Sequence, residues 1–270
     1  MSVGNGKAGM LPKAKKALGQ NFLQDKNIAA KIVRTLHIAP QDAVLEIGPG
    51  PGALTGWVMQ ASPARLVLVE KDNALAFTRM QAERGDFTGK LQVVLADALT
   101  MPWNQFTSPW KFVGNLPYNV ASPLMWDIVS QASGLERAVF MVQKEVAQRI
   151  VAHPETGAYG ALSVWLQSFC RAKLEFVVPP QVFVPRPKVD SAVVSFVPHP
   201  AGTYSFCPVS LAKTIKICFQ MRRKQLGTIL RLSGLNAGVL ELLGISPQLR
   251  PEALPVATFH LLASALFARK

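Results

Sequence analysis

The fold is decided at residues 43–52, where the chain reads AVLEIGPGPG. A short apolar run, Ala43–Ile47, leads at once into three closely spaced glycines and then into a segment with helical periodicity, Leu54–Ala61. Glycines at such a point allow a tight turn and let a ligand approach the backbone where a Cβ atom would clash. The stretch therefore predicts the first strand, turn and helix of an α/β sheet that binds a ligand.

The same alternation of strand and helix continues along the chain. Apolar runs without polar alternation are typical of parallel strands that are buried on both faces. We therefore expect a mainly parallel sheet with helices on both sides. Further strands are predicted at Arg65–Glu70, Leu91–Leu95, Lys111–Val113 and Ala138–Val142. Helices are predicted at Asp25–His37, Asn73–Ala82 and Pro123–Ser130, in addition to Leu54–Ala61.

The pattern changes after Val142. Two helices are expected first, and then two strands separated by the proline-rich segment 179–187. Beyond residue 199 the periodicity is helical throughout, which predicts a small all-helical C-terminal domain. We expect three parts: a disordered basic arm at 1–17, an α/β domain at 18–198, and the helical domain at 199–270. The later elements are predicted at Glu145–Val151, Tyr159–Ser168, Leu174–Val178, Ser191–Val197, Leu211–Phe219, Leu226–Leu232, Val239–Leu243 and Ala257–Phe267.

The positive charge lies at the two ends of the chain. Residues 1–40 hold seven Lys and Arg against one acidic residue, a net charge of +6. Residues 41–198 hold thirteen of each, and residues 199–270 hold nine against two, a net charge of +7. Two basic flanks around a neutral middle favour a polyanionic partner, most simply a nucleic acid. A solubilising tail with a solvated helix face is the alternative.

The remaining composition excludes several classes of protein. The three cysteines and four histidines show no metal-ligand spacing, so we expect no metal site, and free thiols indicate a reducing cytoplasm. No apolar run is long enough to cross a bilayer, and the basic N-terminus lacks the apolar region of a secretory signal. We expect a cytoplasmic protein that does not bind membranes. Nothing in the sequence requires more than a monomer.

The glycine turn favours S-adenosylmethionine over a nicotinamide cofactor. Its spacing is Gly-x-Gly-x-Gly, and the interleaved Pro49 and Pro51 remove backbone N–H donors that a pyrophosphate would need. Glu70 ends the second strand of the sheet, where its carboxylate can accept hydrogen bonds from ribose hydroxyls. Asp97 follows the third strand, where it can accept from an adenine amino group. With Asn115 at the end of the fourth strand, these residues would meet at one edge of the sheet.

The tetrapeptide Asn115-Leu116-Pro117-Tyr118 suggests the chemistry. The exocyclic amine of a nucleobase is a poor nucleophile because its lone pair is delocalised into the ring. An amide oxygen and backbone carbonyls aimed at its hydrogens would stabilise the positive charge that develops as a new bond forms. The ring of Tyr118 can stack on the base.

Five stretches together resemble the rRNA adenine N6-dimethyltransferases. They are Ala17–Leu23 (ALGQNFL), Leu45–Gly52 (LEIGPGPG), Asn115–Tyr118 (NLPY), Phe183–Ser191 (FVPRPKVDS) and Phe219–Lys224 (FQMRRK). The resemblance covers most of the chain and is closest to the bacterial small-subunit (16S) branch. It implies a class I, Rossmann-like S-adenosylmethionine-dependent methyltransferase with a small helical C-terminal domain. It also implies dimethylation of two adjacent adenosines near the 3′ end of the rRNA during ribosome biogenesis.

The resemblance also assigns residues. It implies that Asn115, Leu116, Pro117 and Tyr118 form the target site, with Phe183 as a second stacking face, although Phe183 taken alone reads as a core aromatic. The implied cofactor-binding residues are Gln20, Asn21, Leu23, Glu46, Gly48, Gly50, Glu70, Asp97, Ala98 and Asn115. The candidate RNA-phosphate contacts are Lys13, Lys15, Lys16, Arg186, Lys188, Arg222, Arg223 and Lys224.

Two alternatives remain at the level of the sequence. One is a methyltransferase of large-subunit rRNA that confers antibiotic resistance. The other is a ribosome-assembly or transcription factor that uses this fold without catalysis. The second would be indicated by loss of the glycine turn or of the Asn115 tetrapeptide, and both are intact. A DNA adenine methyltransferase is disfavoured because Leu116 stands where such enzymes typically have proline.

Overall fold

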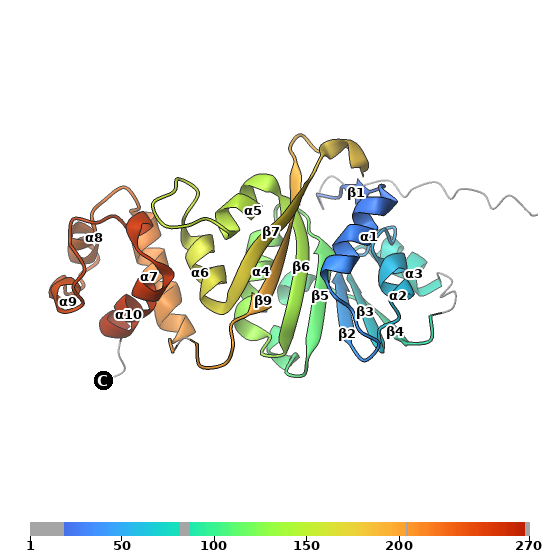
Figure 1. The fold of residues 1–270 in the computed structure, drawn as a ribbon, viewed down its shortest axis with the longest axis horizontal. Helices are drawn as coiled ribbons and strands as arrows, with labels where there is room; N and C mark the ends of the chain where they lie inside the picture. The colour runs from blue at the N-terminus through green and yellow to red at the C-terminus, as the bar shows by residue number, and fades with distance from the viewer. Residues whose placement is uncertain (1–18, 82–86, 204, 268–270) are drawn as a thin grey trace, which may run out of the picture.

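The computed structural model describes residues 19–81, 87–203 and 205–267. Within these ranges a seven-stranded sheet has the strand order β4-β3-β2-β5-β6-β9-β7, and a second sheet pairs β1 with β8. Figure 1 shows an elongated molecule with the large sheet at its centre and helices α7 to α10 gathered at one end. The predicted α/β fold with C-terminal helices is confirmed.

In the large sheet, the neighbouring strands β4, β3, β2, β5 and β6 run parallel to one another. The pairs β6–β9 and β9–β7 are antiparallel. β2 pairs in parallel with β3 and β5, β3 with β4, and β5 with β6, whereas β9 is antiparallel to both β6 and β7. The predicted strands therefore lie where we expected them. The strands are β2 (Ala43–Ile47), β3 (Arg65–Glu70), β4 (Lys90–Leu95), β5 (Trp110–Asn115), β6 (Leu135–Gln143), β7 (Cys170–Val178) and β9 (Ser191–Pro198).

Both faces of the sheet are buried at the strands β2, β3 and β5, and neighbouring residues of one strand point to opposite faces. In β2, Leu45 packs in one hydrophobic cluster with side chains of α4 and α6, while Val44 packs in another with α1 and α2. Phe112 and Val113 of β5 divide in the same way. This explains why the strands read as continuous apolar runs. The helices of this domain are α1 (Lys26–Thr35), α2 (Thr55–Gln60), α3 (Asn73–Gln81), α4 (Ala121–Gln131), α5 (Lys144–Ile150) and α6 (Ala161–Phe169).

The C-terminal helices continue the core on the side of α6. Leu211 and Phe259 are fully buried and belong to the same hydrophobic cluster as Phe140 and Trp165. The indole of Trp165 stacks at 4.0 Å on that of Trp126 from α4. A separate domain beginning at residue 199 stays a prediction, and the expected arm at 1–17 lies outside the described residues. These helices are α7 (Pro208–Gln220), α8 (Leu226–Leu232), α9 (Gly238–Leu242) and α10 (Val256–Phe267).

The two-stranded sheet was not predicted. β1 (Phe22–Leu23) pairs antiparallel with β8 (Phe183–Val184), and the amide of Gln24 donates to the carbonyl of Val182 at 2.8 Å. Two-residue strands carry no hydrophobic period, so no sequence pattern could reveal a pairing across such a long separation. The pairing joins the segment before α1 to the proline-rich segment after β7.

A buried ion pair secures the amino ends of β2 and β5. The ammonium of Lys111 lies 2.6 Å from the Asp42 carboxylate and donates to the carbonyl of His37 at 2.6 Å. The side chains of Lys111 and Asp42 are 7% and 9% exposed, whereas Glu136, which also lies within 3.2 Å of Lys111, is 50% exposed. Separately, no helix in the described part of the chain is long and apolar enough to span a membrane.

We predict that Asp42→Asn lowers the free energy of unfolding by about 3 kcal/mol, because it leaves the Lys111 charge buried without its closest partner. Urea denaturation followed by circular dichroism measures this loss. Glu136→Gln is the matched control and should cost less than about 1 kcal/mol, because solvent screens the exposed pair. Equal losses in the two variants would contradict the prediction.

Candidate active site

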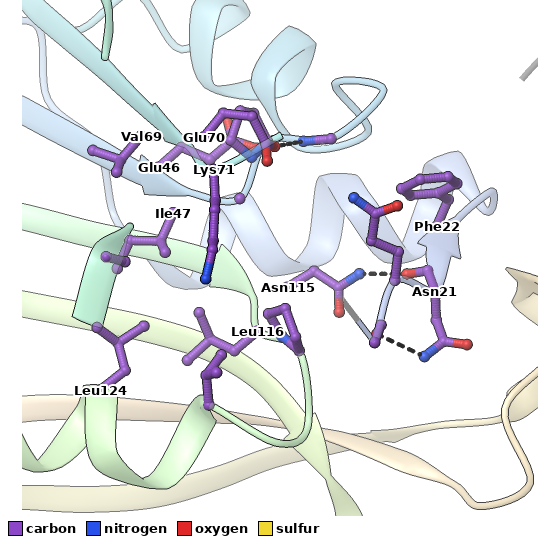
Figure 2. A pocket seen from close by; sticks show the side chains of 18 of the residues that line it. Asn21, Phe22, Glu46, Ile47, Val69, Glu70, Lys71, Asn115, Leu116 and Leu124 are labelled. Carbon is purple, nitrogen blue, oxygen red and sulfur yellow. Dashed lines mark hydrogen bonds between the residues drawn. The ribbon is translucent and has the colours of Figure 1, made fainter. Parts of the chain in front are cut away.

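A cavity of about 170 Å³ opens at the carboxyl ends of the parallel strands. Four regions contribute its walls: the segment before α1, the turn after β2, the ends of β3 and β4, and the segment after β5. Figure 2 shows side chains from the segment before α1, from the ends of β2, β3 and β5, and from α4 around the cavity. The predicted residues that line it are Gln20, Asn21, Leu23, Glu46, Gly48, Gly50, Glu70, Asp97, Ala98, Asn115, Leu116, Pro117 and Tyr118.

The glycine turn forms the floor of the cavity between β2 and α2. Gly48 has φ +64°, and a Cβ atom built on it would meet nothing within 4 Å, so its backbone faces open space in the cavity wall. Gly52 has φ +93°, and a Cβ atom there would lie 2.1 Å from the Arg79 guanidinium. The dihedral angle is what requires glycine at Gly52, because the Arg79 guanidinium is the far end of a flexible side chain and could move away from a Cβ atom.

Glu70 fixes the shape of this turn. One carboxylate oxygen accepts a hydrogen bond from the amide of Gly50 at 3.1 Å, and the other accepts from the amide of Asp72 at 2.9 Å. The side chain is 5% exposed. A carboxylate oxygen can accept more than one hydrogen bond, so these contacts leave acceptor capacity toward the cavity.

Glu46 carries a buried carboxyl group at the base of the cavity. It is 1% exposed, and its Oε2 atom has no hydrogen-bond partner among the described residues. Burial raises the pKa of Glu46 from its ordinary value of 4.5 to about 7, and the nearby Thr55 hydroxyl and the positive charge of Arg79 offset only part of the rise. A buried acceptor without a partner is costly in an isolated protein, and a cationic or N–H-bearing ligand would relieve that cost.

Asp97 lies at the more open rim. Its carboxylate contacts the ammonium of Lys71 at 2.7 Å and accepts from the amide of Leu99 at 3.0 Å. The hydrogen bond from Lys71 is the main reason that the pKa of Asp97 is lowered. Asp97 is therefore ionised at neutral pH and available as an acceptor beside Ala98.

Asn115 links the end of β5 to the segment before α1. Its side-chain amide donates to the carbonyl of Asn21 at 2.9 Å, and Asn21 in turn donates from its side chain to the carbonyl of Gly19 at 3.3 Å. Figure 2 shows both bonds as dashed lines, with the segment before α1 lying across the end of β5. The Asn115 amide oxygen has no part in these two bonds.

Sequence reasoning missed several walls of the cavity. Phe22 lies against the glycine turn, with its ring 3.4 Å from the Cβ position of Gly50. Lys71, Leu99 and Leu124 also line the cavity. The apolar residues Leu99 and Leu124 carry no chemical signature, and only the position of Phe22 within the motif of residues 17–23 could have indicated it.

Phe183 does not line the cavity in this structure. Its side chain is 2% exposed and packs in a hydrophobic cluster with Leu23 and Val178, as its reading as a core aromatic would place it. Its role as a second stacking face stays a prediction.

The predicted RNA contacts are spread over two surfaces. Arg186 and Lys188 are exposed in the proline-rich segment. Arg223 and Lys224 are exposed in the turn between α7 and α8, whereas Arg222 forms a 2.8 Å ion pair with Glu252. Lys13, Lys15 and Lys16 lie outside the described residues.

In the described part of the chain no group of three or more His, Cys, Asp and Glu side chains is arranged to hold a metal ion.

Comparison with known proteins identifies the family of this chain. A family model described as ribosomal RNA adenine dimethylase matches residues 11–266. The chain belongs to this family. It is therefore an S-adenosylmethionine-dependent methyltransferase that acts on adenines of rRNA.

Individual relatives agree with this assignment. The chain is 55% identical over 262 residues to the ribosomal RNA small subunit methyltransferase A of Nitratidesulfovibrio vulgaris strain Hildenborough, a match that covers 95% of this chain and 98% of the relative. Among solved structures, it superposes on a dimethyladenosine transferase from Plasmodium falciparum with a TM-score of 0.77 and 25% identity, covering 89% and 95% of the two chains. The 23S rRNA methyltransferase ErmE gives a TM-score of 0.69 at 25% identity, covering 91% and 99%.

The residues of the cavity fit S-adenosylmethionine. The glycine turn provides open backbone for close approach, and Glu46 offers a buried acceptor that the described residues leave without a partner. The two carboxylates Glu70 and Asp97 lie at the ends of successive strands, where hydroxyl and amino groups could donate to them. Together these groups suit a cofactor that carries positive charge and no phosphate.

The raised pKa of Glu46 predicts how Glu46→Gln changes stability with pH. The folded protein retains the Glu46 proton up to about pH 7, while the unfolded chain loses it near 4.5. The wild type therefore loses stability as pH rises through this window. At pH 8, Glu46→Gln should raise the unfolding free energy of the cofactor-free protein by about 3 kcal/mol. Near pH 4.5 the gain should vanish. Urea titrations at both pH values test this, and a gain of equal size at both would contradict it.

Proposed function

We propose that this chain transfers methyl groups to N6 of two adjacent adenosines near the 3′ end of small-subunit (16S) rRNA during ribosome biogenesis. The substrate would be the RNA within a small subunit or its precursor. The names of the similar bacterial proteins support the small-subunit assignment, because they share about half of their residues with this chain over nearly its whole length. We further propose that the protein acts as a monomer in the cytoplasm.

The observation that carries the proposal is the position of Asn115. It lies at the end of β5, lines the cavity with Glu46 and Glu70, and begins the tetrapeptide that ends at Tyr118. Asn115 therefore lies next to the proposed target site and lines the same cavity as the proposed cofactor-binding residues. That is the position needed by a group that orients an amine toward a methyl donor.

The chemistry rests on orientation and on acceptors. When bound, S-adenosylmethionine supplies a methyl group already activated by a sulfonium centre, so the proposed reaction requires no metal. The amide oxygen of Asn115 and the carbonyl of Leu116 would accept hydrogen bonds from the adenine amine and stabilise the positive charge that develops on it. Tyr118 would stack on the base after it leaves its helix or loop. Water can take the proton that the alkylated amine releases.

We propose cofactor roles for the polar residues that line the cavity. Glu70 would accept from the ribose hydroxyls, and Asp97 from the adenine amino group of the cofactor. Glu46 would lie toward its charged end. The segment that contains Gln20, Asn21 and Leu23 would close over it, because Asn115 already binds that segment through the carbonyl of Asn21.

RNA binding is assigned to the basic surfaces. We propose that residues 199–270 form a helical RNA-binding domain in which Arg223 and Lys224 contact phosphates, and that Arg186 and Lys188 do so beside the cavity. Arg222 would contribute less because Glu252 already pairs with it. The predicted arm, with Lys13, Lys15 and Lys16, would add further phosphate contacts. Such contacts position RNA without reading its sequence.

Labelled methyl transfer to undermethylated small subunits tests the proposed substrate, with naked RNA and large subunits as controls. We expect label on small subunits alone, and mass analysis should identify dimethyladenosine. Label on large-subunit RNA would replace the proposal with the resistance-type activity. Cofactor binding without any transfer would favour an assembly factor that has lost catalysis.

Replacing Asn115 should separate catalysis from folding. We expect Asn115→Ala to lower kcat at least a hundredfold, because the target amine loses its oriented acceptor. Asn104→Ala is the matched control, since Asn104 is exposed and lies outside the cavity lining. Methyl incorporation by Asn115→Ala at the wild-type rate would refute the role of Asn115.

Replacing Glu70 should affect the cofactor first. We expect Glu70→Ala to weaken S-adenosylmethionine binding at least tenfold in isothermal titration calorimetry, because it removes the acceptor for the ribose and frees the amide of Gly50. Glu145→Ala, on the exposed face of α5, is the control. An unchanged dissociation constant in Glu70→Ala would exclude the assigned role.

A further inference from the structure

Ser191 is a buried polar residue to which nothing so far assigns a function. It begins β9 and is 1% exposed. It pairs with Gln143 of β6 on one side and with Val178 of β7 on the other. Its neighbour Asp190 is also fixed, since its carbonyl accepts from the amide of Lys144 at 2.9 Å. Ser191 is therefore held by the sheet on both sides and has little freedom to move.

The Ser191 hydroxyl reaches the aromatic residue of the proposed target site. Its Oγ atom lies 2.8 Å from the hydroxyl oxygen of Tyr118, within hydrogen-bond distance. Tyr118 is half-buried and lines the cavity. Burial raises the pKa of Tyr118 and the bond to Ser191 opposes the rise. The phenol is therefore neutral at physiological pH and presents an uncharged aromatic face.

The other end of Tyr118 is fixed by the backbone. The carbonyl of Pro117 accepts from the amides of Val120 and Ala121, both at 3.1 Å. The amide of Leu116 donates to the carbonyl of Met141 at 3.1 Å. Tyr118 is thus attached at its Cα end to a hydrogen-bonded turn and at its hydroxyl end to β9, which is paired on both sides in the sheet.

We propose that Ser191 is a positioning residue for adenine methylation, and that its hydroxyl holds the Tyr118 ring in the orientation that stacks on the target base. This inference rests on the proposed function of Tyr118. A ring anchored at both ends loses little conformational freedom when a base stacks on it. Without the hydrogen bond the ring could turn about its side-chain torsions, and the amine would spend less time in line with the methyl donor.

Two single variants and their combination test the proposal. Ser191→Ala and Tyr118→Phe remove the same hydrogen bond from opposite sides, and Tyr118→Phe keeps the stacking ring. Each should lower kcat on undermethylated small subunits about three- to tenfold, the effect expected from one hydrogen bond. Because the bond is shared, the double variant should be no slower than the slower single variant. The dissociation constant for S-adenosylmethionine should not change in any of them.

Ser195→Ala is the matched control. Ser195 lies on the same strand, is 4% exposed, and donates to Glu175 at 2.6 Å, but it does not line the cavity. It should lower the thermal midpoint without lowering kcat, which shows what loss of a buried serine on β9 does by itself.

The outcomes distinguish this inference from the proposed function. If Tyr118→Ala abolishes transfer while Ser191→Ala and Tyr118→Phe match the wild type, the positioning role is overturned and the proposed function stands. Additive losses in the double variant would also overturn it, because the two hydroxyls would then act separately. If Tyr118→Ala transfers methyl groups at the wild-type rate, the proposed role of Tyr118 fails, and the inference fails with it. If the wild type itself transfers nothing to small subunits, the proposed function is wrong.

Discussion

The parallel pairing of β4, β3, β2 and β5 is the constraint on which the site depends. Parallel strands end at the same edge of a sheet, and helices that bury both faces leave that edge as the place where polar side chains can gather. Glu70, Asp97 and Asn115 belong to three different strand ends, yet all line one cavity. Neither the proposed cofactor site nor the proposed base site could form from any one of these segments alone.

This arrangement costs free energy because it buries the carboxyl groups of Glu46 and Glu70. Glu46 lies in the same core that gives the sheet its stability, and its carboxyl group has a pKa raised to about 7 by burial. Glu70 is also buried but is held by two backbone amides. Proteins commonly tolerate such strain at functional sites, where a ligand completes the missing interactions. The two carboxyl groups therefore differ in their contacts: Glu70 holds the turn through two amides, whereas the Oε2 atom of Glu46 has no hydrogen-bond partner among the described residues.

The strand ends were predictable because each carries a local signal. Glycines directly after an apolar strand identify the turn at Gly48, and an acidic residue at the end of the next strand identifies Glu70. The boundaries of β3 coincide with the predicted range. The start of α1 was also predictable, because Asp25 accepts hydrogen bonds from the amides of Asn27 and Ile28 and so caps the helix. The family resemblance added roles that the residues alone left open.

What the sequence determined by itself is the order of elements, the parallel sheet and the set of polar residues at its edge, because periodicity and turn chemistry are local properties of the chain. Only the tertiary structure decided which distant residues touch. The β1–β8 pairing, the bond of Asn115 to the carbonyl of Asn21, and the bond between Tyr118 and Ser191 each join segments far apart in the chain. It also placed Phe183 in the core and Arg222 against Glu252. Such contacts depend on how the helices and strands pack together, and this packing produces no periodic pattern in the sequence.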